Sequence, residues 1–448
     1  MKIDKVETFL IEQWLLVKIY TDSGLVGVGE GGVHGFPQAV QAMIQSVEKY
    51  LIGKDPLQIE HLWQSLYRFS HFTGAVVTSG IAAIDIALWD IKGKYHQAPV
   101  YELMGGKCRD KIRVYIDVGG STLEELAESA KSAVREGFTA VRLGPTGERF
   151  WEQSHGQLIS DGIERVAAVR EAVGQYVDVS VEMHRRMTIP EAITFGKEIE
   201  QFRPFFYEDP IRPDSAESMS YVAKNVPIPI ATGERLCTSY EFRELLQMRG
   251  CQYIRPDLCL AGGLTHCKKI AAVAESFNVG VIPHNPLSPI STATCVQLDA
   301  CIPNFVVQEY RRENKPPASD LVDRPYKFQD GYLILPDKPG LGIELNDDFL
   351  EKYEKLRIQY IKETQTFHQS FSNIPNLTVY PSMANFLLIE LLNISSDDFM
   401  IKSLVSHGIY VRTCGDKIGL EGEFIRLASR KKSENQTIIE SINNIINE

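Results

Sequence analysis

From Arg113 onward, segments typical of β-strands alternate with segments typical of helices, and the alternation continues through eight strands in about 200 residues. The strand-like segments are short and rich in β-branched or aromatic residues, whereas the helix-like segments repeat apolar residues every three or four positions. An open doubly wound sheet is the alternative, but no G-x-G-x-x-G turn follows the first strand. Eight units of nearly constant length therefore favour a closed (β/α)8 barrel over residues 113–317. The predicted strands are RVYIDVG, TAVRLG, DVSVEMH, FFYEDP, PIPIATGE, CQYIRPD, GVIPH and FVVQEY.

The residues before the barrel predict a separate small domain. Three strand-like segments, KVETFLIEQ, WLLVKIYTDSG and VGVGEGG, precede three segments of helical periodicity. Strands followed by helices are typical of an α+β domain, which we place at residues 1–112. The extended stretch at 318–350, which is punctuated by Pro and Gly, is expected to join this domain.

The composition changes after residue 350. Residues 351–448 contain eight asparagines, whereas residues 1–350 contain six. A long amphipathic helix, four short strands and a final helix are expected here, with enough apolar residues for a core of their own. We therefore predict an α/β chain with three parts, of which the last is a small α+β module over 351–448.

Charge and hydropathy argue against two classes of function. The formal net charge is −11 and no Lys/Arg cluster is visible, so nucleic-acid binding is not expected. No apolar run reaches the ~18 residues of a membrane span.

The acidic, alternating start MKIDKVETFL lacks the pattern of a signal peptide. The eight cysteines form no C-x-x-C pair, which is typical of reduced thiols in a cytoplasmic protein.

Acidic residues end the predicted strands at regular intervals. Glu182, Glu208 and Glu234 end three consecutive strands, 26 residues apart. The carboxyl ends of barrel strands meet at one mouth, where catalysis occurs. Three carboxylates would repel one another there unless a cation binds, and hard oxygen ligands suit Mg²⁺. We therefore predict a Mg²⁺ site; the alternative is a structural acidic cluster, for which Arg235 and Arg255 could be partners.

Two histidines accompany these carboxylates. His184 lies two residues after Glu182, so the strand period would place both on one face. His284 ends the seventh strand and Asp257 the sixth, and a carboxylate beside an imidazole tunes it as a general base. Glu309 ends the eighth strand in the same series. We expect His184, His284, Asp257 and Glu309 to be catalytic.

Several segments also match the motifs of a known family. They are IAAIDIALWDIKGK, VEMH, FYEDP, IATGERL, IRPDLCLAGGLTHCKKIAAVAE, VIPHNPLSP and PNFVVQEY. Residues 1 to about 350 thereby resemble the enolase superfamily in its mandelate racemase-like branch. They are most similar to acid-sugar dehydratases of the galactonate, gluconate and mannonate type. The resemblance implies a capping domain that closes over the barrel, and an assembly into homo-oligomers.

The same resemblance implies a role for each site residue. Mg²⁺ on the three glutamates would bind a sugar-acid carboxylate and stabilise the enediolate formed when C2 loses its proton. His284, paired with Asp257, would take that proton, and His184 would protonate the departing C3 hydroxyl. Glu309 would hydrogen-bond the enediolate oxygen, for which it would have to be protonated. The product would be a 2-keto-3-deoxy acid.

Three features distinguish this chain within that branch. The first metal ligand is usually Asp, and Glu182 is one methylene longer. The second strand has R-L-G at 142–144 where racemising or lactonising relatives have a K-x-K pair, which favours elimination by the histidines. The loop GPTGERFWEQSHGQL has no Tyr, which favours a galactonate or gluconate substrate over mannonate. Candidate substrate-binding residues are His34, His71, Arg142 and His155.

The C-terminal module resembles a different family. YPSMANFLLIEL and GIYVRTCGDKIGLEGEFIRLASRKKSENQ are similar to the small domain of fold-type I pyridoxal-phosphate-dependent aminotransferases, near the histidinol-phosphate group. In that family the arginine matching Arg426 binds the substrate carboxylate, and the asparagine matching Asn385 lies in the strand motif ANF. The large domain that carries the Schiff-base lysine is absent, so the resemblance implies no transamination. We expect the two parts to join within FLEKYEKLRIQYIKE.

These observations lead to a Mg²⁺-dependent hydro-lyase that acts on a small sugar acid. One alternative is an epimerase of the same superfamily. Another is a metal-binding scaffold, in which Glu182 impairs turnover and the C-terminal module recruits a partner.

Overall fold

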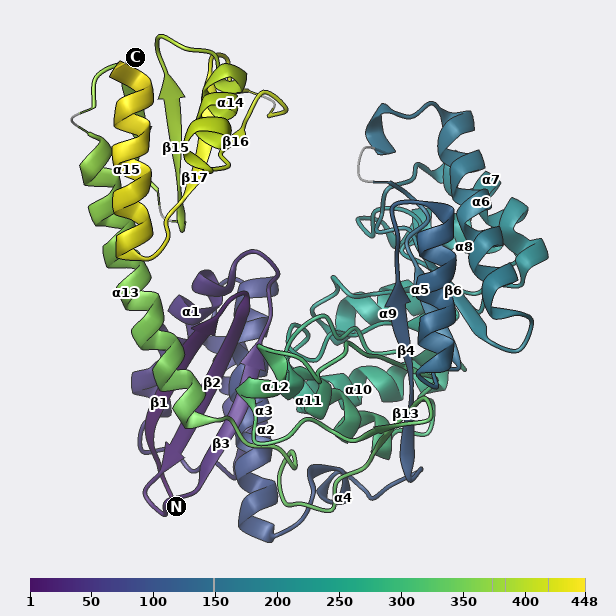
Figure 1. Cartoon of the computed structure of the whole chain (residues 1–448). Helices are drawn as coiled ribbons and strands as arrows, with labels where there is room; N and C mark the ends of the chain where they lie inside the picture. The colour runs from purple at the N-terminus through teal and green to yellow at the C-terminus, as the bar shows by residue number, and fades with distance from the viewer. Residues whose placement is uncertain (148–149, 373, 383, 418, 448) are drawn as a thin grey trace. The chain divides into compact units, whose positions relative to one another are not determined.

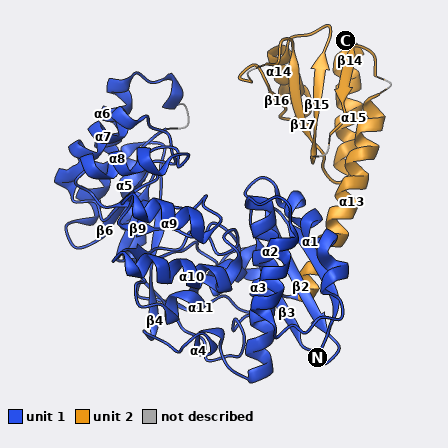
Figure 2. Cartoon of the chain, turned by 180° about the vertical axis from the view of Figure 1, so that it is seen from behind, with its two compact units in different colours: residues 1–346 blue, residues 347–448 orange. Residues whose placement is uncertain are grey.

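The computed structural model describes residues 1–147, 150–372, 374–382, 384–417 and 419–447. The chain divides into two compact units, Met1–Asn346 and Asp347–Glu448 (Figures 1 and 2). The first unit contains the segments predicted as capping domain and barrel. Within the described residues, no helix combines the length and the apolar character needed to cross a membrane.

The capping domain pairs three antiparallel strands with a long buried helix. Its sheet has the order β1-β2-β3. Gly27 and Gly29 of β3 lie directly against α3, because a Cβ at either position would approach a backbone oxygen of that helix to 2.1 Å. Close packing of this kind needs glycine on the strand. The elements are β1 (Ile3–Ile11), β2 (Trp14–Thr21), β3 (Val26–Gly31), α1 (Pro37–Leu51), α2 (Ile59–Phe69), α3 (Ala75–His96) and α4 (Val100–Leu103).

Eight strands form the barrel, at the positions predicted from the sequence. Each pairs in parallel with the next from β4 to β10, and β11 returns to pair in parallel with β4. A parallel bridge between Val281 and Phe305 joins β10 to the segment that leads into β11 and so closes the ring. The strands are β4 (Lys111–Val118), β5 (Ala140–Leu143), β6 (Asp178–Glu182), β7 (Tyr207–Glu208), β8 (Ile230–Thr232), β9 (Tyr253–Ile254), β10 (Gly280–Val281) and β11 (Gln308–Glu309).

Helices connect these strands, and local sequence signals set where they begin. Ser154, Thr188 and Thr238 each form a capping box with a Gln or Glu three residues later, which satisfies free N–H groups of the first turn. The α-helices are α5 (Leu123–Arg135), α6 (His155–Val173), α7 (Ile189–Glu198), α8 (Ala216–Asn225), α9 (Ser239–Gln247), α10 (Gly263–Ser276) and α11 (Pro289–Cys301), with short 3₁₀ turns η1 (Phe150–Glu152) and η2 (Ile199–Phe202).

The segment after the barrel touches both parts of the first unit. After α12 (Ala318–Leu321), a hairpin of β12 (Phe328–Gln329) and β13 (Tyr332–Ile334) pairs antiparallel with the start of β4. The following residues return to the capping helix α3, where Asp90 accepts the N–H of Leu341 and Lys94 pairs with Glu344. The stretch 318–350 was expected to join the capping domain as a whole, whereas its hairpin pairs with the barrel strand β4.

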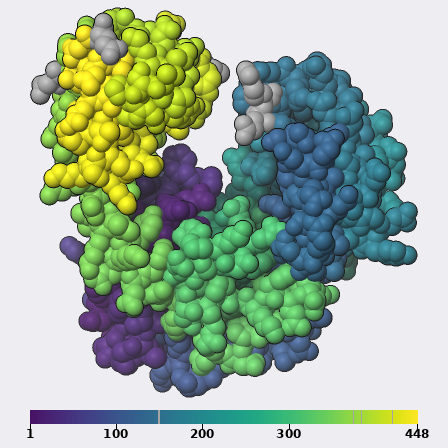
Figure 3. All heavy atoms as spheres, in the orientation of Figure 1, coloured from purple at the N-terminus to yellow at the C-terminus, as the bar shows by residue number. Residues whose placement is uncertain are grey.

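The C-terminal unit has its own sheet and its own core. The antiparallel sheet has the order β14-β15-β17-β16, and buried apolar residues of its strands and helices form a separate cluster. Side chains of α15 cover part of the face of this unit seen in Figure 3. Its elements are α13 (Asp347–Phe371), β14 (Leu377–Tyr380), β15 (Phe386–Leu391), α14 (Ser396–His407), β16 (Arg412–Thr413), β17 (Phe424–Ala428) and α15 (Lys432–Asn447).

Candidate active site at the barrel mouth

Three glutamates lie together at the carboxyl ends of the barrel strands. Glu182 and Glu208 end β6 and β7 and are register partners in the parallel sheet. Glu234 follows β8 after Gly233, whose φ of +127° is one that glycine adopts readily. Each side chain offers a carboxylate oxygen, and these oxygens lie within 4.8 Å of one another. The spacing of 26 residues in the sequence thus corresponds to one cluster in space, which we call the glutamate cluster.

The glutamate cluster is shielded from solvent. The side chains of Glu182, Glu208 and Glu234 are 2%, 0% and 9% exposed. Burial and the neighbouring Glu208 raise the pKa of Glu182 well above its ordinary value. Burial opposes ionisation of Glu234 as well, but His284 and Arg185 outweigh it and lower the pKa of Glu234 to about 2. Three convergent carboxylate groups fit a hard divalent cation. Such a cation would also stabilise the charged form of Glu182, which burial and Glu208 disfavour.

Three arginines border the glutamate cluster. Arg142 of β5 places Nη1 2.9 and 3.0 Å from the two carboxylate oxygens of Glu208. Arg255 places Nε 2.6 Å from Glu208. Arg185 donates to Glu234 and also pairs with Asp209. Arg255 was one of the two partners considered for a purely structural acidic cluster. The arginines around the glutamates could therefore also neutralise such a cluster without a metal ion.

His284 and Asp257 form a tight pair beside the cluster. His284 Nδ1 lies 2.8 Å from Asp257 Oδ2, and the other oxygen of Asp257 accepts the backbone N–H of Cys259. His284 Nε2 lies 3.5 Å from Glu234. Burial lowers the pKa of His284, but Glu234 and the hydrogen bond to Asp257 outweigh it and raise that pKa to about 9. Asp257 therefore fixes Nδ1 and leaves Nε2 turned toward the glutamate cluster. A general base needs this ring neutral, and a cation bound to Glu234 would favour the neutral ring by offsetting the carboxylate that raises this pKa.

His184 is close to Glu182, but not because of strand periodicity. β6 ends at Glu182, and His184 lies in the turn that follows with φ +48°. Its backbone N–H donates to Glu182 Oε1 at 2.5 Å, and its Nδ1 lies 3.9 Å from the same oxygen. About half of the side chain is exposed. Burial of the rest and nearby Arg142 lower the pKa of His184, which reduces the protonated form that a general acid needs.

Glu309 is held as a carboxylate. Its oxygens lie 2.8 Å from Arg142 Nη2 and 2.6 Å from Arg255 Nη2, and one accepts the backbone N–H of Asn285. Burial would raise the pKa of Glu309, but the two guanidiniums outweigh it and hold that pKa well below its ordinary value. The expectation that Glu309 is protonated is therefore wrong for this arrangement, because two buried cations stabilise its charge.

A cavity of about 420 Å³ opens beside His284. Its wall combines the capping loop that carries His34 and Phe36 with barrel residues that include Glu234 and Asp257. A volume of this order suits a small organic ligand. Of the predicted substrate-binding residues, His34 thus lies at the cavity.

The other predicted substrate-binding residues lie elsewhere. Arg142 is 5% exposed and is engaged by carboxylates. His155 begins α6 and lies 3.8 Å from Glu191, and His71 is exposed in the bend before α3. Among the described residues that line the cavity, neither His71 nor His155 is present.

Two cavity residues were missed by the sequence analysis. Arg185 and Arg235 line the wall, and each directly follows a predicted site residue, His184 and Glu234. Their position next to these residues in the sequence was the signal that could have identified them as cavity residues. Arg235 was considered only as a structural partner for the acidic residues, whereas its side chain is exposed at the cavity.

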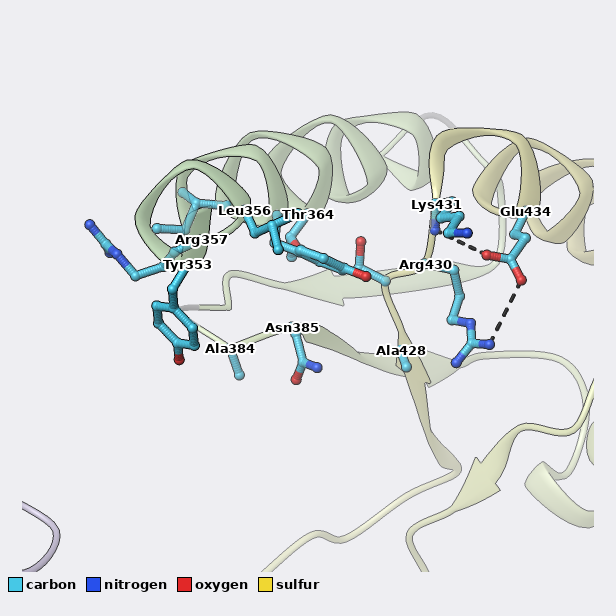
Figure 4. A pocket seen from close by; sticks show the side chains of 13 residues that line it. Tyr353, Leu356, Arg357, Thr364, Ala384, Asn385, Ala428, Arg430, Lys431 and Glu434 are labelled. Carbon is cyan, nitrogen blue, oxygen red and sulfur yellow. Dashed lines mark hydrogen bonds and ion pairs between the residues drawn. The ribbon is translucent and has the colours of Figure 1, made fainter. Parts of the chain in front are cut away.

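The C-terminal unit has a pocket of its own, of about 740 Å³ (Figure 4). Tyr353 and Leu356 of α13 form one wall, and Asn385 faces them across the pocket. Arg430 lies 3.7 Å from Glu434 at one end. Arg426 is not among the lining residues; its exposed guanidinium lies 4.9 Å from the ring centroid of Phe386.

Comparison with known families decides the affiliation of the first unit. Residues 125–349 match the family described as enolase C-terminal domain-like, and residues 5–105 match the N-terminal domain of mandelate racemase and muconate lactonizing enzymes. The chain belongs to the enolase superfamily, in its mandelate racemase/muconate lactonizing enzyme branch. The resemblance inferred from the motifs, and the fold of capping domain plus barrel, are confirmed.

Relatives within the superfamily are dehydratases by name. The chain is 38% identical over 365 residues to D-galactonate dehydratase of Pectobacterium atrosepticum, a match that covers 79% of this chain and 95% of the relative. It is 38% identical over 356 residues to D-galactonate dehydratase of Cronobacter sakazakii, covering 78% and 93%. The family matches end at residue 349, so nearly all of the C-terminal unit lies outside them.

Solved structures lead to the same group. A putative dehydratase from Salmonella Typhimurium has a TM-score of 0.75 at 36% identity, covering 79% of this chain and 98% of that one. A putative galactarate dehydratase from Agrobacterium radiobacter, with bound Na and L-malate, has a TM-score of 0.75 at 32% identity, covering 79% and 95%.

Proposed function

We propose that this chain is an acid-sugar dehydratase, which converts an aldonate such as galactonate or gluconate into a 2-keto-3-deoxy acid. One observation carries the proposal. The Asp257–His284 pair lies beside three convergent glutamates in a chain that is 38% identical to D-galactonate dehydratases. A base and a site for an anion-stabilising cation are the two elements that removal of a proton next to a carboxylate requires.

We assign Mg²⁺ to Glu182, Glu208 and Glu234. The assignment is supported by the donor set, which consists of carboxylate oxygens within 4.8 Å of one another. When bound, the ion would stabilise the negative charge that develops on the substrate carboxylate.

The protein residues then divide the proton transfers. His284 takes the C2 proton on Nε2, while Asp257 holds Nδ1 at 2.8 Å and stabilises the imidazolium that results. His184 donates a proton to the departing C3 hydroxyl from the turn after β6. His34, with Arg185 and Arg235, faces the distal part of the substrate in the cavity.

Glu309 takes a different role from the one that the resemblance implied. Because it is held as a carboxylate between Arg142 and Arg255, it cannot donate a hydrogen bond to an enediolate oxygen. We propose instead that Glu309 positions these two guanidiniums next to the glutamate cluster.

The test is a panel of five- and six-carbon aldonates and aldarates, incubated with Mg²⁺ in D₂O. We expect a 2-keto acid to accumulate with galactonate or gluconate, and not with H284N. Deuterium entering C2 without keto acid would instead favour an epimerase. Metal binding without product or exchange across the whole panel would overturn the enzymatic proposal in favour of a scaffold.

We also propose a cytoplasmic location and assembly into a homo-oligomer. The location is supported by the cysteines, because all eight are free and thiols stay reduced in that compartment. Light scattering on the purified full chain measures the oligomeric state.

A further inference from the structure

Arg142 is anchored on both sides by carboxylates. On one side, its Nε and Nη2 bind Asp117 at 2.6 and 3.0 Å, where the two residues are register partners in β4 and β5. On the other side, Nη1 binds both oxygens of Glu208 and lies 3.4 Å from Glu182. Nη2 also donates to Glu309. The guanidinium therefore uses all of its nitrogens at a site that is 5% exposed.

The oxygens that Arg142 binds belong to the glutamate cluster. Of the arginines in the described part of the chain, Arg142 is the one paired with Glu182. Glu208 shares Arg255, and Glu234 has Arg185, so each of these has another cation. Without Arg142, the adjacent buried carboxyl groups of Glu182 and Glu208 would have one cation fewer between them, which is costly.

We propose that Arg142 is an internal counter-cation, which occupies the Glu182 and Glu208 oxygens in the metal-free protein and competes there with a divalent ion. This inference rests on the metal site in the proposed function. Two positive charges that share the same oxygens repel each other, and a buried site screens that repulsion poorly. Arg142 thus stabilises the metal-free fold and weakens its affinity for the ion.

The way Arg142 is anchored would allow its guanidinium to move away from the glutamate oxygens when a metal ion binds. Only Nη1 contacts Glu182 and Glu208, whereas Nε and Nη2 are held by Asp117 and Glu309. The side chain of Asp117 is 51% exposed, so the guanidinium can move toward a solvated carboxylate and keep one partner. Arg142 is a positioning residue in this scheme.

The experiment measures metal binding and metal-free stability in wild type and R142M. Methionine removes the charge and keeps an unbranched chain of similar reach. We expect R142M to bind Mn²⁺ at least tenfold more tightly by calorimetry, and to melt at a lower temperature without metal. R113M is the matched control, because Arg113 lies on the neighbouring strand β4 and pairs with Asp178 at 2.7 Å instead of with the cluster. The Mn²⁺ affinity of R113M should equal that of wild type.

Equal or weaker Mn²⁺ binding by R142M would overturn the inference. If R142M does not fold, the Mn²⁺ affinity of R142K tests the inference instead, since one ammonium cannot reach Glu208 while it holds Asp117 and Glu309. Mn²⁺ binding at least threefold tighter than in wild type would support the inference. No tightening would overturn it. Absence of Mn²⁺ binding in wild type would overturn the metal site and this inference together. Normal binding without dehydration overturns only the proposed function.

Discussion

His284 is the residue on which the proposed chemistry depends most directly. Its Nδ1 is occupied by Asp257, so Nε2 is the nitrogen available to a substrate. We predict that H284N abolishes both deuterium exchange at C2 and formation of keto acid, a loss of roughly 10²–10⁴-fold or more for a general base. Proton NMR in D₂O measures the exchange. Exchange at the wild-type rate would show that another group is the base.

His184 separates the two proton transfers. It lies on the Glu182 side of the cluster, and its side chain is half exposed. We predict that H184N keeps C2 exchange while dehydration falls by about 10²-fold or more, because only the acid for the leaving hydroxyl is missing. The ratio of exchange to keto acid in one NMR sample measures this. Dehydration that survives in H184N would refute the assigned role.

At this scale, the sequence predicted which acidic residues converge but not how they are neutralised. Strand-end position fixes the direction of a side chain, so Glu182, Glu208 and Glu234 could be placed together. Ion pairs depend on the reach of long side chains across neighbouring strands. The pairing of Arg142 with Asp117 and Glu208, and the resulting charge of Glu309, could therefore not be derived from spacing.

Individual elements were easier to predict than their ends. All eight barrel strands occur where the alternation placed them, although four of them contain only two residues of regular pairing. The β6 strand was extended through His184 in the prediction, whereas a left-handed turn begins after Glu182. No glycine or proline marks that turn, so the sequence carried no signal for it.

The packing of α11 against the segment after β11 makes the stability of the fold depend on pH, because it buries Glu313. Glu313 is 3% exposed and near Thr292 of α11, and burial raises the pKa of Glu313 from 4.5 to about 8. Between these values the folded protein keeps a proton that the unfolded chain releases. Stability must therefore fall as pH rises through this window, and level off above pH 8.

We predict that E313Q removes this component. Wild type should lose about 2–3 kcal/mol more unfolding free energy than E313Q between pH 6 and pH 9, because one pKa unit corresponds to ~1.4 kcal/mol. Urea unfolding of both proteins at several pH values measures the difference, and the other buried acids, Glu30 and Asp85, contribute equally to both. Parallel pH profiles would show that Glu313 ionises freely in the folded state.

For the whole molecule, the composition predicted a separate C-terminal module, and the structure begins this unit at Asp347 instead of residue 351. The expected join within FLEKYEKLRIQYIKE falls inside a single continuous helix, α13. Helical periodicity does not reveal where one folding unit ends if the helix runs on, so the sequence could place the join only approximately.

The C-terminal unit has the features of an independently folding unit. Its sheet contains only its own strands, and its apolar core is formed by residues from Phe367 onward. The catalytic residues and the cavity beside His284 all belong to the first unit. We predict that a chain ending at Asn346 keeps kcat and KM within about threefold of the full chain, since ΔΔG‡ below ~1 kcal/mol is expected when no catalytic contact is lost.

A chain ending at Pro339 is the matched control. It also loses the contacts of Leu341 with Asp90 and of Glu344 with Lys94, which tie the end of the first unit to α3. We expect this shorter chain to lose stability, because Asp90 is buried and would lack a partner that it now has. If the chain ending at Asn346 instead loses activity by a hundredfold while its melting temperature is unchanged, the C-terminal unit takes part in catalysis, and the assignment of the active site to the first unit alone is wrong.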